Sequence, residues 1–263
     1  MRWYTGDATY DTLLGGALAF AVFVFVVSWF LPSPYGRFAS TRFGISVDSR
    51  LGWFLMELPA TLSFFYFFSR GPHRAETVPL VFMCMWAIHY SNRGFFFPMS
   101  MRVAKGDKGS FSALVIVTGW GVTSLHGYFH AAYFTRFGHY STAWLTDPRF
   151  VIGLIVYYSC LVMNIRSDAT IRNLRTREEI AAGTKVYRIP QGGLFRWVTS
   201  PSYLTELGAW AGFALCTWSL AGLFIFVVSA GNLVPRAIAT HRWYRERFPD
   251  YPTDRKALIP FVW

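Results

Sequence analysis

The chain has 263 residues, of which 53% are hydrophobic and 19% aromatic, while only 15% are charged. Soluble domains carry about 25% charged residues, so this composition excludes an ordinary soluble protein and is typical of an integral membrane protein. The formal net charge of +11 must concentrate in the connections and at the C-terminus, because apolar segments exclude charge.

Seven apolar runs are each of about the length that crosses a bilayer, roughly 20 residues. They cover residues 12–31, 51–69, 77–98, 111–134, 149–165, 203–218 and 219–235. The last two runs adjoin, so they form either one long helix or a hairpin that turns at Trp218 and Ser219. We expect the hairpin, because a helix of 33 residues would overshoot the hydrocarbon core. The predicted fold class is an all-α integral membrane protein with seven transmembrane helices.

The distribution of basic residues predicts the orientation of these helices. Of the 25 Lys and Arg residues, 20 belong to one set of alternate connections together with the C-terminal tail, and five to the other set. By the positive-inside rule the N-terminus is outside and the tail is cytosolic. No repeat or shift in composition marks a second domain, so residues 1–263 are expected to form a single multi-pass membrane domain, in the inner membrane if the source is a bacterium.

A polar stretch, residues 164–206, separates two apolar runs. It contains aromatic residues, a Pro-Gln-Gly-Gly turn and seven basic residues, a mixture that favours order. Asn164, Asp168, Arg172 and Arg175 follow one another at spacings of four, four and three, so they share one face if the fifth helix continues past the membrane surface. These side chains suit a ligand with amide, hydroxyl and phosphate groups. The alternative is a solvated helix end with one ion pair between Asp168 and Arg172.

The C-terminal tail shares the cytosolic side with that stretch, and we expect the two to build one site. It combines cations with rings that can stack, namely Arg236, His241, Arg242, Tyr244, Arg255 and Lys256. A basic tail can bind anionic lipid, but here rings, prolines and acidic residues interrupt the charge, which favours a polyanionic cofactor. No GxGxxG, P-loop, HExxH or CxxC pattern occurs, so a dinucleotide would bind between helices, held by guanidinium groups, and no metal site is predicted.

Glu57 is an ionisable residue inside the second apolar run, with no basic residue nearby in that run to pair with it. Such a group is a functional candidate by default, although a neutral Glu bonded to a neighbouring helix is the alternative. At 1.5 Å per residue, Glu57 lies about 9 Å and Tyr90 of the antiparallel third run about 12 Å from the same surface. A protonated carboxyl beside a phenol can donate two hydrogen bonds to one carbonyl oxygen, as an oxyanion hole does. The neighbouring His89 receives no assigned role.

Taken together, these motifs resemble those of the steroid 5α-reductase family, membrane enzymes that reduce the double bond of 3-oxo-Δ4 steroids with NADPH. The resemblance covers residues 53–263 and is carried by NIRSD, IRNLR, YRIPQGGLF, SYLTELGAW, CTWSLAG, HRWY and RKALIPFVW. It implies a seven-helix fold with NADPH on the cytosolic side. It also implies a substrate pocket mainly from helices within residues 1–135 and a cofactor site mainly from residues 164–263.

The resemblance further implies a role for individual residues. Glu57 and Tyr90 match the catalytic pair that hydrogen-bonds the steroid ketone. The positions that match the cofactor-binding pattern, or stand where the family has a cofactor contact, are Trp53, Asn164, Asp168, Arg172, Arg175, Tyr187, Arg188, Ser202, Glu206, Arg236, His241 and Tyr244. Ser202 stands where animal members have Asn, and residues of the loop 101–109 are not carried over, because that loop looks longer than the animal pattern.

The predicted function is therefore the conjugate reduction of a flat, apolar enone, a steroid or similar molecule, that reaches the protein from the lipid bilayer. NADPH is expected over NADH because Arg172, Arg175, Arg188 and Arg236 are candidates for binding a 2′-phosphate. No nucleic acid and no obligatory protein partner is expected. Three alternatives stay open: a membrane methyltransferase of the isoprenylcysteine type, a reductase of a non-steroid lipid enone, and a seven-helix lipid transporter or receptor in which Glu57 binds a proton or substrate.

Overall fold

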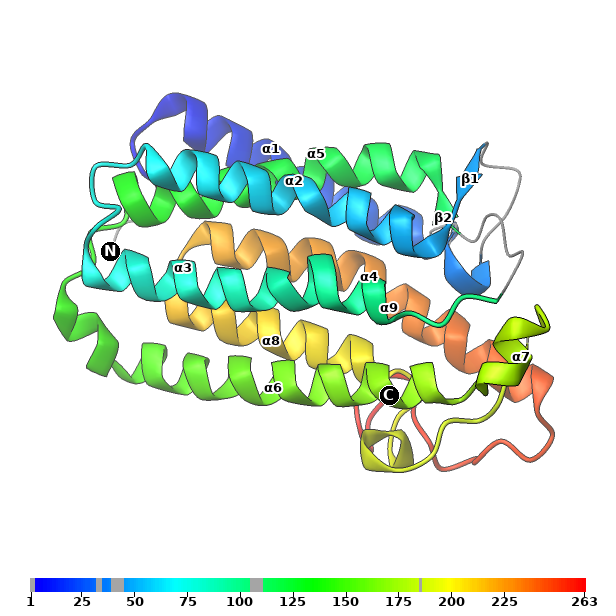
Figure 1. Ribbon diagram of the computed structural model, residues 1–263. Coiled ribbons are helices and arrows are strands. Elements are labelled where there is room, and N and C mark those ends of the chain that lie inside the picture. Colours follow the sequence, from blue (N-terminus) through cyan, green and yellow to red (C-terminus); the bar gives the residue numbers. More distant parts are fainter. Residues whose placement is uncertain (1–2, 32–34, 39–44, 105–110, 185) are drawn as a thin grey trace.

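The computed structural model describes residues 3–31, 35–38, 45–104, 111–184 and 186–263. Long helices dominate it and run side by side along the length of the molecule (Figure 1). They are α1 (Ala8–Ser28), α2 (Ser49–Ser69), α3 (Thr77–Tyr90), α5 (Ala113–Ala132), α6 (Pro148–Asn173), α8 (Pro201–Thr217) and α9 (Leu220–Arg247). Each of them coincides with one of the seven predicted apolar runs.

Shorter elements prolong or connect these helices. A π-helical segment, η3 (Ser91–Phe96), and then α4 (Phe97–Ser100) prolong α3, and a second π-helical segment, η4 (Tyr133–Phe137), prolongs α5. The remaining elements are η1 (Gly36–Phe38), β1 (Ser46–Val47), β2 (Phe111–Ser112), η5 (Thr142–Thr146), α7 (Arg177–Ala181) and η6 (Gly193–Arg196). The strands β1 and β2 pair in antiparallel fashion, with Ser46 opposite Ser112 and Val47 opposite Phe111.

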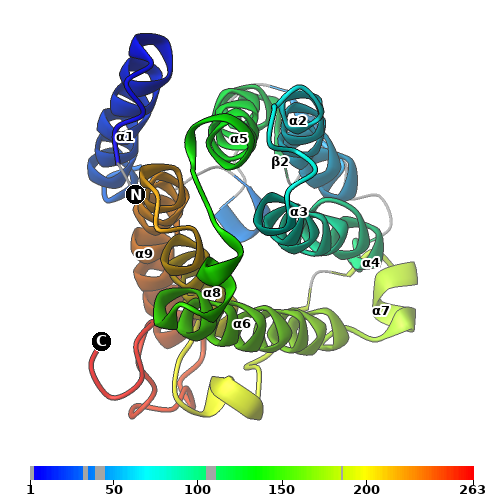
Figure 2. The same ribbon diagram turned by 90° about the vertical axis from the view of Figure 1, so that its left-hand side faces the viewer.

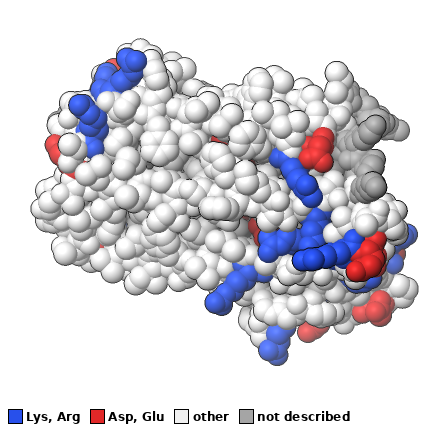
Figure 3. Space-filling view, in the orientation of Figure 1, with Lys and Arg blue, Asp and Glu red and all other residues white. Residues whose placement is uncertain are grey.

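The helices have the surface of a membrane protein. Four of those in the described residues, α1, α2, α6 and α9, are long and apolar enough to cross a bilayer by length and composition. The α-helical part of α3 has only 14 residues and α8 has 17, while α5 carries His126 and His130. Figure 3 shows charged side chains gathered toward the two ends of the molecule, with a largely uncharged band between them. Seven crossings and the orientation stay predictions.

Local sequence signals explain where the helices begin and turn. Asp48 starts α2 by accepting hydrogen bonds from the backbone N–H groups of Arg50 and Leu51. Ser219 starts α9 in the same way, accepting from Gly222 N at 3.0 Å. Trp218, just before it, has a left-handed φ of 45° and ends α8. The predicted hairpin between α8 and α9 is therefore confirmed, and one long helix is excluded.

The interior of the bundle is filled by aromatic rings and closely packed helices. Viewed along the helices, α1 lies at the edge of the bundle against α9 (Figure 2). Helices α6 and α8 approach so closely that a Cβ atom on Gly153 would lie 2.6 Å from the backbone oxygen of Gly212. In the core, the ring of Trp86 stacks on Phe64 at 4.4 Å and on Tyr90 at 4.7 Å between centroids. This stack fixes the position of Tyr90.

The polar stretch 164–206 and the C-terminal tail are joined, as predicted. Helix α6 continues to Asn173, beyond the apolar run, and the chain enters η6 through Gly192 and Gly193 at φ values of 80° and 50°, which glycine adopts at no steric cost. Val198 pairs with Lys256 of the tail, and Arg255 Nη1 donates to the carbonyl of Pro190 at 3.2 Å. The two segments thus form one end of the molecule.

Candidate active site

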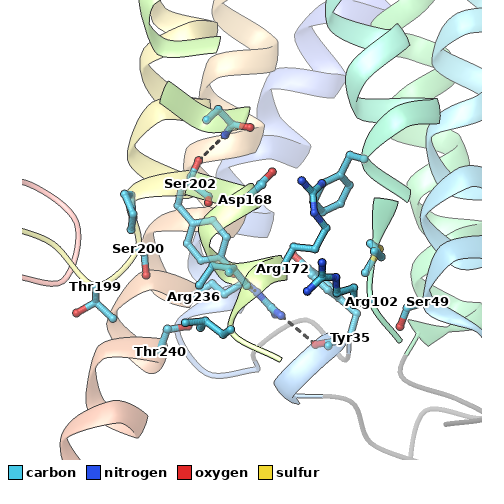
Figure 4. Close-up of a pocket in the computed structure, with 18 of the residues that line it drawn as sticks. Tyr35, Ser49, Arg102, Asp168, Arg172, Thr199, Ser200, Ser202, Arg236 and Thr240 are labelled. Carbon is cyan, nitrogen blue, oxygen red and sulfur yellow. Dashed lines mark hydrogen bonds between the residues drawn. The ribbon is translucent and has the colours of Figure 1, made fainter. Parts of the chain in front are cut away.

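A cavity of about 380 Å³ opens at the end of the bundle where these two segments meet the helices (Figure 4). Most of its lining comes from residues 164–263, the region expected to bind the cofactor. Residues before position 104, among them Tyr35, Trp53 and Arg102, complete the wall. The cavity therefore joins both halves of the chain.

Eleven of the twelve residues predicted to bind the cofactor line this cavity. They are Trp53, Asn164, Asp168, Arg172, Arg175, Tyr187, Arg188, Ser202, Glu206, Arg236 and Tyr244. The exception is His241, whose Nδ1 lies 2.6 Å from the hydroxyl oxygen of Thr199. Thr199 lines the cavity and also bonds to Tyr251 at 2.7 Å, so His241 lies behind the wall and supports it.

The predicted polar face of α6 is directed into the cavity. Asn164 Nδ2 donates to the carbonyl of Ser202 at 2.8 Å, which ties α6 to the start of α8. Asp168 and Arg172 follow one and two turns later and both line the cavity (Figure 4). Within the described residues they do not form an ion pair with each other, although Arg172 is close enough to influence the Asp168 carboxyl. The structure therefore differs from the alternative of a solvated helix end with one ion pair.

Two of the arginines proposed for a phosphate already have protein partners. Arg236 is 5% exposed, donates from Nε to the hydroxyl of Tyr203 and from Nη2 to the carbonyl of Tyr35, both at 2.9 Å, and lies 3.7 Å from the centre of the Tyr35 ring. Arg188 forms a two-pronged ion pair with Glu179 and also donates to the carbonyl of Leu174. Hydrogen bonds from Arg188 hold the pKa of the Glu179 carboxyl at about 2, so this pair is charged at neutral pH.

Three other arginines form the outer wall with their charges facing the cavity. Arg175 donates from Nε to the carbonyl of Val186 at 3.2 Å, and Arg102 donates from Nη1 to the carbonyl of Arg175 at 3.0 Å. Both bonds engage neutral carbonyl groups, so these bonds do not neutralise the guanidinium charges, although Arg175 also lies near the Glu179 carboxylate. Arg172 makes no hydrogen bond or ion pair with any residue in the described part of the chain. An anion would find cationic donors here.

Glu57 and Tyr90 are buried neighbours beside the inner end of the cavity, which is the end lined by Arg93 and Glu206. A Cβ atom on Gly94 would lie 3.8 Å from Glu57 Cβ and 4.0 Å from Tyr90 Cδ1, so both side chains border the same small space. Glu57 is 8% exposed and Tyr90 4%. Glu57 has no basic neighbour in its own helix, but another segment supplies one, because Arg93 Nε lies 3.8 Å from Glu57 Oε1. Arg93 belongs to the π-helical segment after α3, and such a widened turn leaves no mark in the sequence pattern.

An aromatic wall connects this inner end to the rest of the cavity. The guanidinium group of Arg93 lies over the ring of Trp53 at 4.5 Å and over Phe97 at 4.9 Å. Trp53 in turn packs edge-on against Tyr35 at 5.5 Å between ring centres. Trp53, Arg93, Phe97 and Tyr35 all line the cavity. The cavity therefore runs from an arginine-rich outer wall to Arg93 and Glu206. Glu57 and Tyr90 are not among the residues that line it; they lie beside this end, with Glu57 3.8 Å from Arg93.

Sequence reasoning missed Arg93, Arg102 and Tyr35 as lining residues. In a regular α-helix a spacing of three residues would place Arg93 on the same face as Tyr90, and this was the one signal for Arg93 in the sequence. The π-helical turn that holds Arg93 had no such signal. Arg102 lies in the loop whose residues were not carried over from the family resemblance. Tyr35 precedes α2 in a segment without a distinctive motif, and no sequence signal marked it.

Comparison with known proteins gives one consistent family. The family model described as 3-oxo-5-alpha-steroid 4-dehydrogenase matches residues 110–263. The chain is 38% identical over 251 residues to "3-oxo-5-alpha-steroid 4-dehydrogenase 1" of Rattus norvegicus, covering 95% of this chain and 93% of the relative. It is 34% identical over 248 residues to "Steroid 5-alpha-reductase DET2" of Solanum lycopersicum, covering 94% of each. The human 3-oxo-5-alpha-steroid 4-dehydrogenase 1 is 33% identical over 88% of this chain.

Proposed function

Because this chain belongs to the 3-oxo-5-alpha-steroid 4-dehydrogenase family, we propose that it reduces the Δ4 double bond of 3-oxo-Δ4 steroids to 5α-3-oxosteroids with NADPH. Membership makes it an oxidoreductase of the steroid 5-alpha-reductase type in a membrane. The cofactor, the route of the hydride and the residue roles are our proposal. The observation that carries them is the cavity, which runs from an arginine-rich outer wall to Arg93, 3.8 Å from the buried Glu57.

The lining of the cavity fits a long, polyanionic dinucleotide. Arg102, Arg172 and Arg175 offer positive charge to phosphate groups, and guanidinium forks match phosphate oxygens. Tyr187 offers a ring that can stack on a base, and Glu206 offers an acceptor at the inner end. When bound, NADPH supplies the hydride. The chain itself contributes binding, orientation and the electrostatic field around the substrate carbonyl.

At the inner end we assign Tyr90 and Glu57 to the steroid ketone. The Tyr90 hydroxyl and the protonated Glu57 carboxyl donate hydrogen bonds to the carbonyl oxygen, which makes the β carbon of the enone electrophilic. Arg93, 3.8 Å from Glu57, adds a positive charge close to the carbonyl oxygen, where negative charge would develop on hydride transfer to the β carbon. Protonation of the resulting enolate at the α carbon would complete the reduction. Both donors are nearly inaccessible to water, which strengthens these interactions.

At the outer end we assign Arg172 and Arg102 to the 2′-phosphate that distinguishes NADPH from NADH. Arg188 is compensated by Glu179, and Arg236 is held by Tyr203 and Tyr35, so neither offers a free guanidinium edge comparable to that of Arg172. Arg102 approaches from the other half of the chain and bonds to the end of α6. This choice keeps Arg172 from the four arginines that the sequence suggested and adds Arg102.

The same proposal covers the arrangement in the membrane. We propose seven crossings, an outside N-terminus and a cofactor cavity that opens to the cytosol, supported by the basic residues around it. Residues 1–263 would form one domain, in which helices within residues 1–135 receive the steroid from the bilayer and residues 164–263 hold most of the cofactor.

A methyltransferase of the isoprenylcysteine type is not favoured, because the matched family and relatives carry oxidoreductase names. S-adenosylmethionine has no phosphate group and would leave the arginine-rich wall without a ligand. A transporter or receptor is not favoured for the same reasons. The alternative within the same reaction type is reduction of a non-steroid lipid enone, because the apolar helices do not specify one substrate.

The test is an assay of the purified protein in lipid nanodiscs with NADPH and a panel of enones. We expect nicotinamide absorbance to fall with progesterone-like and testosterone-like enones, and a product that is two hydrogen atoms heavier by mass spectrometry. Preference for linear enones would move the assignment to another lipid. No oxidation of NADPH with any enone would overturn the proposal.

A further inference from the structure

A buried polar contact joins α3 to α8 at the inner end of the cavity. Glu206 of α8 is 8% exposed and lines the cavity. Trp210, one turn later, donates from its indole N–H to Glu206 Oε1 at 3.0 Å. His89 Nε2 of α3 lies 3.7 Å from the same oxygen. Two side chains from two helices are therefore directed at one oxygen, and the other carboxylate oxygen takes no part in either contact.

The His89 imidazole is unusual for a buried group. It is 2% exposed, and neither of its nitrogens has a hydrogen-bond partner in the described part of the chain. Its ring packs against Trp210 at 4.3 Å between centres, so it is held beside Glu206. Buried polar atoms without partners are costly and call for an explanation. One explanation is that the contact between His89 and Glu206 is too long for a hydrogen bond in this state and shortens to one when the ligand is bound.

The position of Glu206 connects this contact to the reaction. Arg93 lies within electrostatic range of both Glu206 and Glu57, and His89 directly precedes Tyr90 in the chain. Glu206 therefore lies where the cofactor cavity meets the pair assigned to the ketone. The end of the cofactor that gives up hydride must reach this place if it is to react.

We propose that His89 and Trp210 are positioning residues that hold the Glu206 carboxylate toward the hydride-donating end of the cofactor. In the complex with the cofactor both donate to Oε1, which leaves Oε2 to accept a hydrogen bond from the ligand. The His89 contact shortens to a hydrogen bond when the cofactor draws Glu206 into place. This inference rests on the proposed function, because it requires a nicotinamide cofactor in the cavity.

The chain offers a matched control in His126. This imidazole of α5 is 1% exposed, both its nitrogens lack partners in the described residues, and its ring packs edge-on against Trp210 at 5.3 Å. It makes no hydrogen bond or ion pair with Glu206 among the described residues. Replacing His126 therefore tests the loss of a buried imidazole in the same core without loss of the Glu206 contact.

The experiment measures equilibrium binding of two ligands to His89→Phe, Trp210→Phe, their double variant and His126→Phe in nanodiscs. One ligand is NADPH, and the other is 2′-phospho-ADP-ribose, which lacks the nicotinamide. We expect His89→Phe and Trp210→Phe each to weaken NADPH about tenfold and to leave the fragment within twofold of wild type. The fold-loss of NADPH affinity in the double variant should be smaller than the product of the fold-losses in the two single variants, because both groups act on one oxygen.

Thermal stability and a conservative variant separate positioning from packing. His89→Phe removes two unpartnered nitrogens and should not lower Tm, whereas a packing role predicts lower Tm together with weaker binding of both ligands. His89→Gln keeps a donor and should recover most of the NADPH affinity. Equal behaviour of His89→Phe and His126→Phe toward NADPH, or an equal loss for the fragment, overturns the inference. A wild-type protein that binds no NADPH refutes the proposed function instead.

Discussion

The outer wall of the cavity and the buried region beside its inner end are built differently. The difference indicates that the outer wall binds the cofactor and that the buried region acts on the substrate carbonyl. At the outer wall Arg102 and Arg175 are tied to backbone carbonyls and Arg172 has no such bond among the described residues, so cationic charge faces a space that solvent can enter. At the inner end Glu57 and Tyr90 are almost completely buried, and a π-helical turn delivers Arg93 to them. Accessible positive charge suits recognition of phosphates, while buried donors with fixed positions suit stabilisation of a transition state. Variants at the outer wall should therefore change binding, and variants at the inner end should change turnover.

The largest effect is expected at the inner end. Tyr90→Phe removes one donor to the carbonyl oxygen, and loss of one such donor typically costs a hundredfold to a thousandfold in kcat. Glu57→Gln replaces an acidic O–H by a much weaker amide donor and should cost a similar factor. Steady-state kinetics with a steroid enone measures both.

Binding measurements provide the control for these two variants. Tyr90→Phe keeps the ring that stacks on Trp86, so the fold and the affinity for NADPH should be unchanged. Near-normal turnover in both variants would remove the assignment of the pair. A loss of NADPH affinity as large as the loss of turnover would contradict the division between the two ends.

An intermediate effect is expected at the outer wall. Arg172→Gln should raise the KM for NADPH about tenfold with little change in kcat, because a charge-assisted hydrogen bond to the 2′-phosphate is lost. The KM for NADH, which lacks that phosphate, should stay the same. Arg102→Gln should act in the same direction.

Arg166→Gln is the matched control, since Arg166 is an exposed arginine of α6 that does not line the cavity. It should leave both KM values unchanged. If Arg172→Gln raises the KM for NADH as much as that for NADPH, Arg172 does not read the 2′-phosphate.

The smallest effect concerns the pH dependence of the loop after α6. Hydrogen bonds from Arg188 lower the pKa of Glu179 from 4.5 to about 2. A carboxyl with a pKa lowered by folding contributes stability above its ordinary pKa, and this contribution disappears as the pH falls through the folded value. Hydrogen exchange of residues 174–184 should therefore accelerate between pH 4.5 and about 2. Glu179→Gln or Arg188→Gln should remove this part of the pH dependence, and an unchanged profile in both would show that the pair does not hold the loop.

The outer wall was largely predictable from the sequence, and the inner end only in part. Spacings of four residues in α6 identified Asn164, Asp168 and Arg172, because a helix continues as a regular repeat beyond the membrane surface. The seven helix positions and the hairpin at Trp218 followed from apolar length. The rise of 1.5 Å per residue was enough to predict that Glu57 and Tyr90 lie at one level, because both are counted from the same membrane surface.

What could not be predicted depends on tertiary contacts or irregular backbone. The pairing of Arg93 with Glu57 needs a π-helical turn, and the role of Tyr35 as a partner of Arg236 joins residues 201 positions apart. His241 was expected to touch the cofactor, but its hydrogen bond to Thr199 places it behind the cavity wall. A basic or aromatic residue in a motif shows that a site exists, and only the packing of the helices shows which atoms are already engaged.

The destination of the hydride tests the central claim most directly. The wild-type protein would be supplied with NADPH that carries deuterium at the transferable position of the nicotinamide, together with a 3-oxo-Δ4 steroid, and the product analysed by NMR. The account predicts deuterium at the β carbon of the former enone, in a 5α saturated ketone. Deuterium on the carbon that bears the oxygen, with an alcohol as product, would contradict it.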